Sequence, residues 1–242
     1  MVDAVAPPPP LGADDALFLD FDGTLVSLAP APHRVRVAPA VPRCLCALSR
    51  RLAGAVAIVS GRTVDDLRRR LKPWDGAIVG QHGLEIRRAD ARVVRRHAAP
   101  PHFPSLERFA AAHPGVLLED KGATVALHYR QAPALAPAVV AAAAAAVNGA
   151  EGWRVVEGKM VVELVPRGIG KGAAIRELLG EPPFRGRRPV FAGDDRTDED
   201  GFATVTAEGG VAVRVGPGPS AAGYRLPDVR AVLAWLGSEA DA

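Results

Sequence analysis

Short apolar runs, separated by segments with helical spacing, constrain the fold of this chain more than any other feature. Runs of this length with few polar residues are typical of strands buried on both faces, as in a parallel sheet covered by helices. Between the first runs, Ala40–Leu52 and Thr63–Leu71 have the apolar period of helices. We therefore predict an α/β fold with a parallel sheet. The predicted strands are Ala16–Phe21, Ala55–Ser60, Ala77–Gly80, Pro189–Ala192 and Gly210–Arg214.

The middle of the chain has a different pattern. Its apolar runs alternate more openly with polar residues, as in strands that keep one face in solvent. Two helical stretches, Ser105–His113 and Ala134–Val147, separate these runs. We predict a smaller inserted α/β domain at residues 85–166 and a core domain at residues 13–84 and 167–242. Residues 1–12 are Pro-rich and predict a flexible N-terminal tail.

Composition excludes several classes of function. The chain has 242 residues and a net charge of +3, and its densest basic stretches, Arg68–Arg70 and Arg185–Arg188, lack interleaved aromatic residues, so no nucleic-acid partner is expected. No segment resembles a secretory signal, and the longest apolar stretch is too rich in alanine to cross a membrane. Cys44 and Cys46 have no metal or redox spacing, which favours a reduced, cytoplasmic protein. The sequence predicts no oligomeric state.

Two acidic residues, Asp20 and Asp22, end the first predicted strand in the run Leu-Asp-Phe-Asp-Gly-Thr-Leu. The period of a strand puts both on one side, and Gly23 allows a sharp bend after them. Two carboxylates so close repel each other unless a cation or a shared proton holds them. Two solvated loop aspartates would account for the acidity, but not for the buried strand in front of them.

Three more polar motifs lie at element boundaries. Ser60-Gly61-Arg62 ends the second strand and opens a helix. The Ser60 hydroxyl and the free N–H groups at the start of this helix suit phosphate oxygens. Lys171-Gly172 opens the helix after the insert, and lysine is rare here, at four of 30 basic residues. Asp194, Asp195 and Asp198 follow another strand and form a hard-oxygen site suited to Mg²⁺. The carboxyl edge of such a sheet is where ligands bind.

These four motifs, in this order, resemble those of the haloacid dehalogenase-like superfamily. The resemblance implies a Rossmann-like core with the insert as a C2-type cap. It also implies that Asp20 is the nucleophile and that Asp22 is the acid and base. Ser60, Gly61 and Lys171 would hold the phosphoryl group. The carboxyl at Asp22 favours a phosphatase or phosphomutase over a dehalogenase or an ion-pumping ATPase.

The resemblance further implies a Mg²⁺ cofactor. The metal would be held by Asp20, by Asp194 and by Asp22, which contributes its backbone carbonyl. Asp195, Asp198 and Arg62 would support this group from the next layer outward.

The insert is similar to that of the trehalose-6-phosphate phosphatase family. The segments that carry this similarity are Glu119–Arg130, Glu157–Pro166 and Gly80–Glu85. The similarity implies that a sugar is bound by Glu119, Arg130, Lys159 and Glu163, with His82 as a further candidate. Lys159 and Glu163 have an even separation and are expected to share one face of a strand. Val165 departs from the family, which often has a basic residue there.

The expected function is therefore hydrolysis of trehalose 6-phosphate, in trehalose biosynthesis, through a phospho-aspartate intermediate. A phosphatase for sucrose phosphate or mannosylglycerate phosphate remains an alternative. A phosphomutase is disfavoured because the stretch between Asp22 and Ser60 is too short for the cap that mutases carry. A non-catalytic sugar-phosphate sensor is disfavoured by the paired Asp20 and Asp22.

Overall fold

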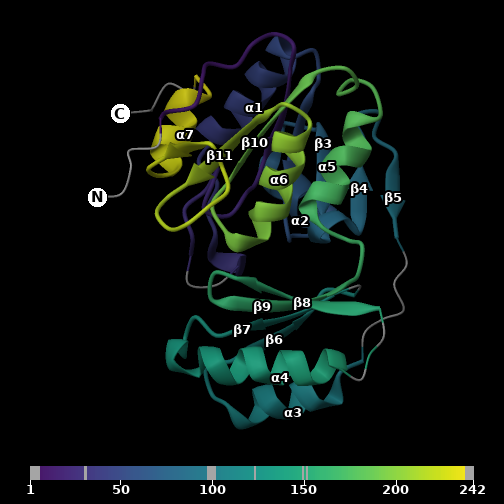
Figure 1. Ribbon diagram of the computed structural model, residues 1–242, viewed down its shortest axis with the longest axis vertical. Coiled ribbons are helices and arrows are strands. Elements are labelled where there is room, and N and C mark those ends of the chain that lie inside the picture. The colour runs from purple at the N-terminus through teal and green to yellow at the C-terminus, as the bar shows by residue number, and fades with distance from the viewer. Residues whose placement is uncertain are drawn as a thin grey trace. The chain divides into compact units, whose positions relative to one another are not determined.

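The computed structural model describes residues 6–29, 32–96, 102–122, 124–148, 150 and 152–237. The chain forms two compact units (Figure 1). The core unit contains residues up to 95 and from 170 onward, and the inserted unit contains residues 96–169. In the part of the chain described, no helix combines the length and apolar character needed to cross a membrane.

The core unit is built on one eight-stranded sheet with the order β12-β11-β10-β1-β2-β3-β4-β5. Six of these strands are parallel, whereas β4 and β5 extend the β3 edge as an antiparallel pair. The strands are β1 (Asp15–Leu19), β2 (Val56–Val59), β3 (Ala77–Gly80), β4 (Glu85–Arg87), β5 (Val93–Arg95), β10 (Arg188–Gly193), β11 (Val211–Val215) and β12 (Tyr224–Leu226). Every residue of β1, β2 and β3 is buried, as expected for interior parallel strands.

The helices of the core unit follow its strands, as in other α/β folds. Helix α2 shows why these segments are helical: Thr63 caps its N-terminus, two aspartates lie in its first turn and three arginines lie in its last. The core helices are α1 (Ala40–Arg51), α2 (Val64–Leu71), α5 (Lys171–Leu179), α6 (Glu199–Ala207) and α7 (Val229–Trp235), with short 3₁₀ turns η1 (Pro32–Arg34), η2 (Gln81–Gly83) and η4 (Arg196–Asp198).

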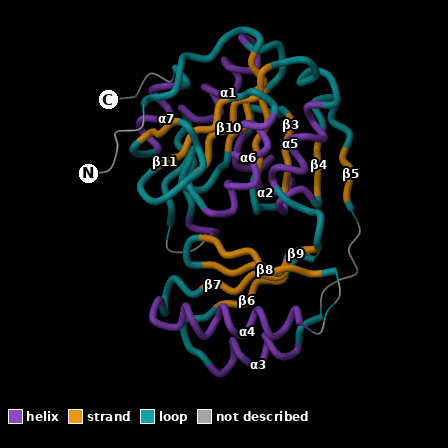
Figure 2. Tube along the Cα trace, viewed as in Figure 1, coloured by secondary structure: helices purple, strands orange, loops and turns teal. Residues whose placement is uncertain are grey.

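The inserted unit is a four-stranded antiparallel sheet with helices on one face (Figure 2). Its strand order is β6-β7-β9-β8, and α4 packs against β8 and β9. A separate apolar core lies between sheet and helices, with Leu106, Leu127 and Val139 fully buried. The elements are α3 (Pro104–Ala112), β6 (Leu117–Asp120), β7 (Val125–His128), η3 (Pro133–Leu135), α4 (Ala136–Asn148), β8 (Trp153–Gly158) and β9 (Val161–Pro166).

The boundaries of the units differ from the sequence-based prediction. Strands β4 and β5, expected to fall within the insert, belong to the core sheet because they pair with β3 and with each other. The compact insert therefore begins at residue 96 rather than 85. The described part of the predicted tail is also packed, because Trp235 Nε1 donates a hydrogen bond to the Pro9 carbonyl at 2.9 Å. Residues 1–5 lie outside the described residues.

Candidate active site

The predicted catalytic residues of the core unit come from segments at one edge of its sheet. Asp20 directly follows β1, Ser60 follows β2 and Asp194 follows β10, so three parallel strands deliver them at their carboxyl ends. Lys171 is the first residue of α5. All four side chains are buried, so their charges interact with little screening by water.

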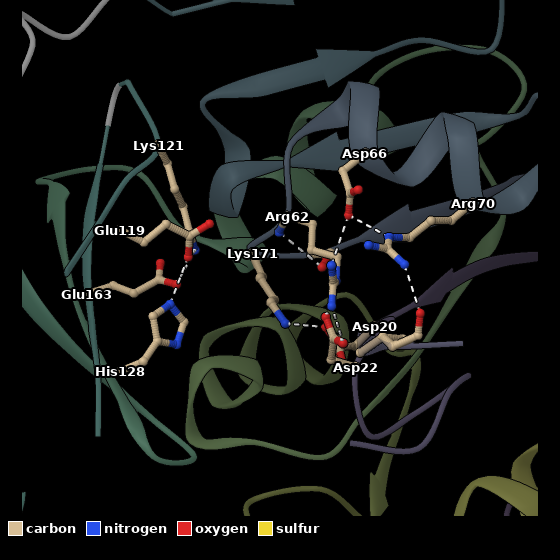
Figure 3. A network of polar contacts seen from close by, with 12 residues as sticks. Asp20, Asp22, Arg62, Asp66, Arg70, Glu119, Lys121, His128, Glu163 and Lys171 are labelled. Atoms are coloured by element: carbon tan, nitrogen blue, oxygen red, sulfur yellow. Dashed lines mark hydrogen bonds and ion pairs between the residues drawn. The ribbon is translucent and has the colours of Figure 1, made fainter. Parts of the chain in front are cut away.

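Lys171 lies between two carboxylates, and Figure 3 shows its contact with Asp20. Its Nζ donates to Asp20 Oδ1 at 2.7 Å and to Asp198 Oδ1 at 2.6 Å. Burial lowers the pKa of Lys171, but the charges of Asp198 and Asp20 outweigh that effect and raise its pKa above the ordinary value. The lysine is therefore a cation at neutral pH, as a phosphate-binding residue must be.

The environment of Asp20 is dominated by its burial, which raises the pKa of this carboxyl well above its ordinary value. Lys171 opposes the rise, whereas the charges of Asp198 and Asp194 add to it. One ammonium thus faces three buried carboxylates. A second cation near them would lower the free energy of the ionised cluster.

The arrangement of these three carboxylates fits a hard metal ion. Asp20, Asp194 and Asp198 can each place one oxygen within 4.8 Å of the others, and carboxylate oxygens are the ligands that Mg²⁺ prefers. Two glycines leave the room that these side chains need. A Cβ at Gly23 would lie 2.1 Å from Asp194 Oδ2, and one at Gly193 would lie 2.3 Å from Asp198 Cγ.

This carboxylate group differs from the predicted metal set. It contains Asp198, which was expected one layer further out. The predicted contribution of Asp22 is its backbone carbonyl, which a group of side-chain carboxylates does not include. Asp195 caps the η4 turn: its Oδ1 accepts from the Arg196 N–H at 2.7 Å, and its own N–H donates to Asp198 Oδ2 at 2.9 Å. Asp195 therefore orients Asp198 through its backbone.

Asp22 is held by a different partner. Its carboxylate accepts two hydrogen bonds from Arg62, from Nε at 2.6 Å and from Nη2 at 2.9 Å. Arg62 also donates from Nη1 to Asp66 Oδ2 at 2.9 Å, a partner not predicted from the sequence. The general acid expected at Asp22 is thus part of a polar network extending into α2 (Figure 3).

The segment predicted to bind phosphate contacts His82. Ser60 Oγ accepts from the Arg62 N–H at 3.2 Å, which turns the chain sharply after β2. A Cβ at Gly61 would lie 2.6 Å from His82 Nε2, so only a glycine lets the imidazole lie against this turn. His82 is buried and has a left-handed backbone, with φ of 56°. Such strain in a non-glycine residue is often found at functional sites.

In the inserted unit, two predicted sugar-binding carboxylates lie on one face of the sheet. The strand register places Glu119 opposite Ala126, and Ala126 opposite Glu163. The small Ala126 side chain leaves a gap between them, and Lys121 Nζ occupies this region, 2.6 Å from Glu163 Oε1 and 4.0 Å from Glu119 Oε2. His128 lies two residues along β7 and contacts Glu119 Oε2 at 2.7 Å.

This four-residue cluster of Glu119, Lys121, His128 and Glu163 contains two members that the sequence analysis did not select. The rarity of lysine was a signal for Lys121, and neither residue type nor spacing marked His128. The hydrogen bond with His128 lowers the pKa of Glu119, with the Lys121 charge adding to the effect and burial opposing it. The cluster therefore offers an ionised carboxylate beside a cation, which is a suitable partner for sugar hydroxyls.

The other two predicted sugar-binding residues, Lys159 and Arg130, lie in turns of the inserted unit rather than on its strands. Lys159 does not share a strand with Glu163, because β8 ends at Gly158 and β9 begins at Val161. The turn residue Met160 has φ of 64°, which ends the strand geometry there. Arg130 Nη2 donates to the Lys159 carbonyl at 3.4 Å.

Comparison with known proteins identifies the family of this chain. A family model described as trehalose-phosphatase matches residues 18–230. The chain belongs to the trehalose-phosphatase family. This confirms the resemblance drawn from its motifs.

Individual relatives support the same assignment to the trehalose-phosphatase family. It is 44% identical to a probable trehalose-phosphate phosphatase of Sinorhizobium fredii over 84% of this chain and 78% of that protein. It is 39% identical to the trehalose-6-phosphate phosphatase of Escherichia coli over 98% of this chain and 90% of that protein. The C-terminal domain of Candida albicans trehalose-6-phosphate phosphatase has the same fold, with a TM-score of 0.82 at 21% identity, covering 97% and 98% of the two chains.

Proposed function

We propose that this protein hydrolyses trehalose 6-phosphate to trehalose and inorganic phosphate, in trehalose biosynthesis. One observation carries the chemistry: the buried carboxylate of Asp20 lies at the carboxyl end of β1, 2.7 Å from the Lys171 ammonium and grouped with Asp194 and Asp198. The substrate follows from the family and from the relatives at 39–44% identity. We further propose that the enzyme works in the cytoplasm.

In the proposed first step, an Asp20 oxygen attacks the phosphorus atom. The bond from phosphorus to the sugar oxygen breaks, and that oxygen takes a proton from Asp22. In the second step Asp22 takes a proton from water, whose oxygen attacks phosphorus as the bond to Asp20 breaks. Phosphate is released and both carboxyl groups return to their starting states. Proton transfer by a positioned side chain contributes about 10²- to 10⁴-fold to such rates.

Other residues bind the phosphoryl group. Lys171 donates from the side of Asp20, while the Ser60 hydroxyl and the Gly61 backbone offer further donors. We propose that Asp20, Asp194 and the backbone carbonyl of Asp22 hold Mg²⁺, with Asp198 and Asp195 beside them. When bound, Mg²⁺ supplies positive charge that offsets the phosphate and the carboxylates.

The inserted unit is proposed to bind the sugar. Carboxylates of Glu119 and Glu163 would accept hydrogen bonds from sugar hydroxyls, and Arg130, Lys159 and Lys121 would donate to sugar oxygens. His82, against the phosphate-binding turn, is the further candidate within the core unit.

Phosphate release from a panel of sugar phosphates with Mg²⁺ tests this function. We expect release from trehalose 6-phosphate far above release from glucose 6-phosphate or sucrose 6-phosphate, lost in Asp20→Asn and after chelation of the metal. Asp14→Asn is the matched control, because it makes the same change at an exposed residue of the same segment. Preference for another ester would overturn the proposed substrate. Tight binding without any release would favour a sugar-phosphate sensor.

A further inference from the structure

Arg62 and Asp66, to which the proposed chemistry gives no role, extend a polar network from Asp22 into α2. The Arg62 guanidinium contacts two carboxylates at once: Nε and Nη2 bind Asp22 at 2.6 and 2.9 Å, and Nη1 binds Asp66 at 2.9 Å. The Arg62 side chain is only 11% exposed, and its guanidinium lies 5.4 Å from the centre of the Phe21 ring. A planar fork bound on both sides has little freedom to rotate.

Asp66 is in turn fixed from several directions. Its Oδ2 also accepts from Arg70 Nε at 2.7 Å, and Arg70 Nη1 donates to the Val35 carbonyl at 2.9 Å. The backbone N–H of Asp66 donates to Thr63 Oγ1 at the start of α2. The main chain of Asp66 is therefore fixed. Its second cationic partner, Arg70, is itself anchored by the Val35 carbonyl.

The charge state of Asp66 suits this role. Burial by itself would raise the pKa of Asp66, but hydrogen bonds from Arg70 and Arg62 outweigh it and hold the pKa below its ordinary value. The carboxylate is ionised at neutral pH and gives Arg62 a permanent anionic partner on the side opposite Asp22.

We propose that Asp66 is a positioning residue for catalysis: it holds the Arg62 guanidinium, which in turn directs the carboxyl group of Asp22 for its two proton transfers. This inference rests on the proposed function, in which Asp22 is the acid and base. The alternative is that the network only cross-links α2 to the loop after β1, which would affect stability without affecting the chemical steps selectively.

Kinetics of Asp66→Asn separate these possibilities. Misplacing a reacting group by about 1 Å can cost about 10²-fold in rate, so we expect kcat for trehalose 6-phosphate to fall about 10- to 100-fold. The dissociation constant of trehalose 6-phosphate, measured in an Asp20→Asn background, is expected to change less than about 3-fold, because the proposal gives Asp66 no contact with the substrate. Loss of binding equal to the loss of rate would overturn the proposal.

Two comparisons make the test specific. Asp65→Asn is the matched control: it removes one carboxylate from the same turn of α2, where Asp65 is 64% exposed and 3.5 Å from Arg95, and it should leave kcat unchanged. For p-nitrophenyl phosphate, whose phenolate leaves without a proton, kcat/KM of Asp66→Asn should fall less than about 3-fold. The positioning role would be contradicted if Asp66→Asn lost the same activity toward trehalose 6-phosphate and p-nitrophenyl phosphate. It would also be contradicted if Asp65→Asn lost as much activity as Asp66→Asn.

A double variant tests whether Asp66 acts through Arg62. Arg62→Lys keeps the charge but cannot form the fork, so its kcat should fall at least as far as that of Asp66→Asn. Because both residues act in one chain of contacts, adding Asp66→Asn to Arg62→Lys should cause little further loss. If the kcat losses of the two single variants multiply in the double variant, Asp66 acts independently of Arg62. If wild type releases no phosphate, the proposed function fails and this inference with it, whereas an active wild type beside a fully active Asp66→Asn refutes this inference alone.

Discussion

Gly23→Ala gives a direct test of the proposed metal site. The Cβ added at Gly23 would lie 2.1 Å from Asp194 Oδ2, whereas ordinary contacts begin at 3.4 Å. The Asp194 carboxylate must therefore move by about 1.3 Å, the difference between these distances. A displacement of about 1 Å in a catalytic group can cost about 10²-fold, so we expect kcat/KM to fall about 100-fold.

The same variant should lose only the stability that an alanine with left-handed backbone costs. Gly23 has φ of 87°, and alanine in this left-handed region costs about 1–2 kcal/mol. Because the short Asp194 side chain can turn away, its collision with the new Cβ should add little to this loss in the free energy of unfolding. Gly54→Ala is the matched control: φ is 85°, and the nearest atom, Pro183 Cγ, is at an ordinary 3.6 Å. Gly54 precedes β2, at the end of that strand opposite Ser60.

Urea unfolding and phosphate release, measured on both variants, decide the question. We expect both to lose about 1–2 kcal/mol in the free energy of unfolding, with only Gly23→Ala losing activity and Mg²⁺ affinity. Activity of Gly23→Ala within about 3-fold of wild type would refute the role given to Asp194. Equal loss of activity in Gly54→Ala would show that backbone strain alone is responsible.

Three further predictions follow from the described contacts. Lys171→Met removes the ammonium between Asp20 and Asp198, and kcat should fall by about 10²- to 10³-fold in the phosphate-release assay; a smaller change would place the phosphate elsewhere. Lys121→Met removes the cation between the two carboxylates that we propose bind the sugar, and KM for trehalose 6-phosphate should rise about 10-fold with kcat nearly unchanged; a fall in kcat alone would contradict this. Burial alone would raise the pKa of Asp66, but hydrogen bonds from Arg70 and Arg62 hold this pKa below its ordinary value. The charge of Asp66 therefore stabilises the fold above about pH 4 and loses that effect as the pH falls further. The gap in unfolding free energy between wild type and Asp66→Asn should therefore shrink from pH 7 to pH 3.5, and a widening gap would show the reverse linkage.

The core sheet could be predicted because its strands are buried on both faces. Runs such as Ala16–Phe21 have no solvent side, and a short run of this kind, bounded by turn residues, is typical of an interior parallel strand. Strands β4 and β5 were assigned to the wrong unit because they are short, and because β5 at the edge of the sheet is exposed along its length and lacks the apolar run of the interior strands. Only the pairing of β4 with β3 assigns them to the core sheet, and pairing is not written in local periodicity.

The placing of Asp20 and Lys171 at element boundaries could be predicted from the sequence, since Asp20 follows a buried strand and Lys171 begins a helix. In the structure Lys171 Nζ lies 2.7 Å from Asp20 Oδ1, and the roles given to the two residues stay predictions. Asp66 could not be found in this way, because an aspartate in the first turn of a helix is already accounted for by the helix dipole. The pairing of Lys121 with Glu163 depends on the register of β6, β7 and β9, which the sequence does not specify.

The position of β1 in the sheet has a consequence for the synthesis of this protein on the ribosome. One edge of β1 pairs with β2, but the other pairs with β10, which begins at Arg188. At about 5–20 residues per second, a ribosome needs roughly 10–30 s to make the intervening chain. Throughout that interval a strand that is apolar apart from Asp15 presents unpaired backbone groups to other nascent chains. We expect soluble yield to depend on chaperone supply during translation, and a yield indifferent to chaperone depletion would contradict this.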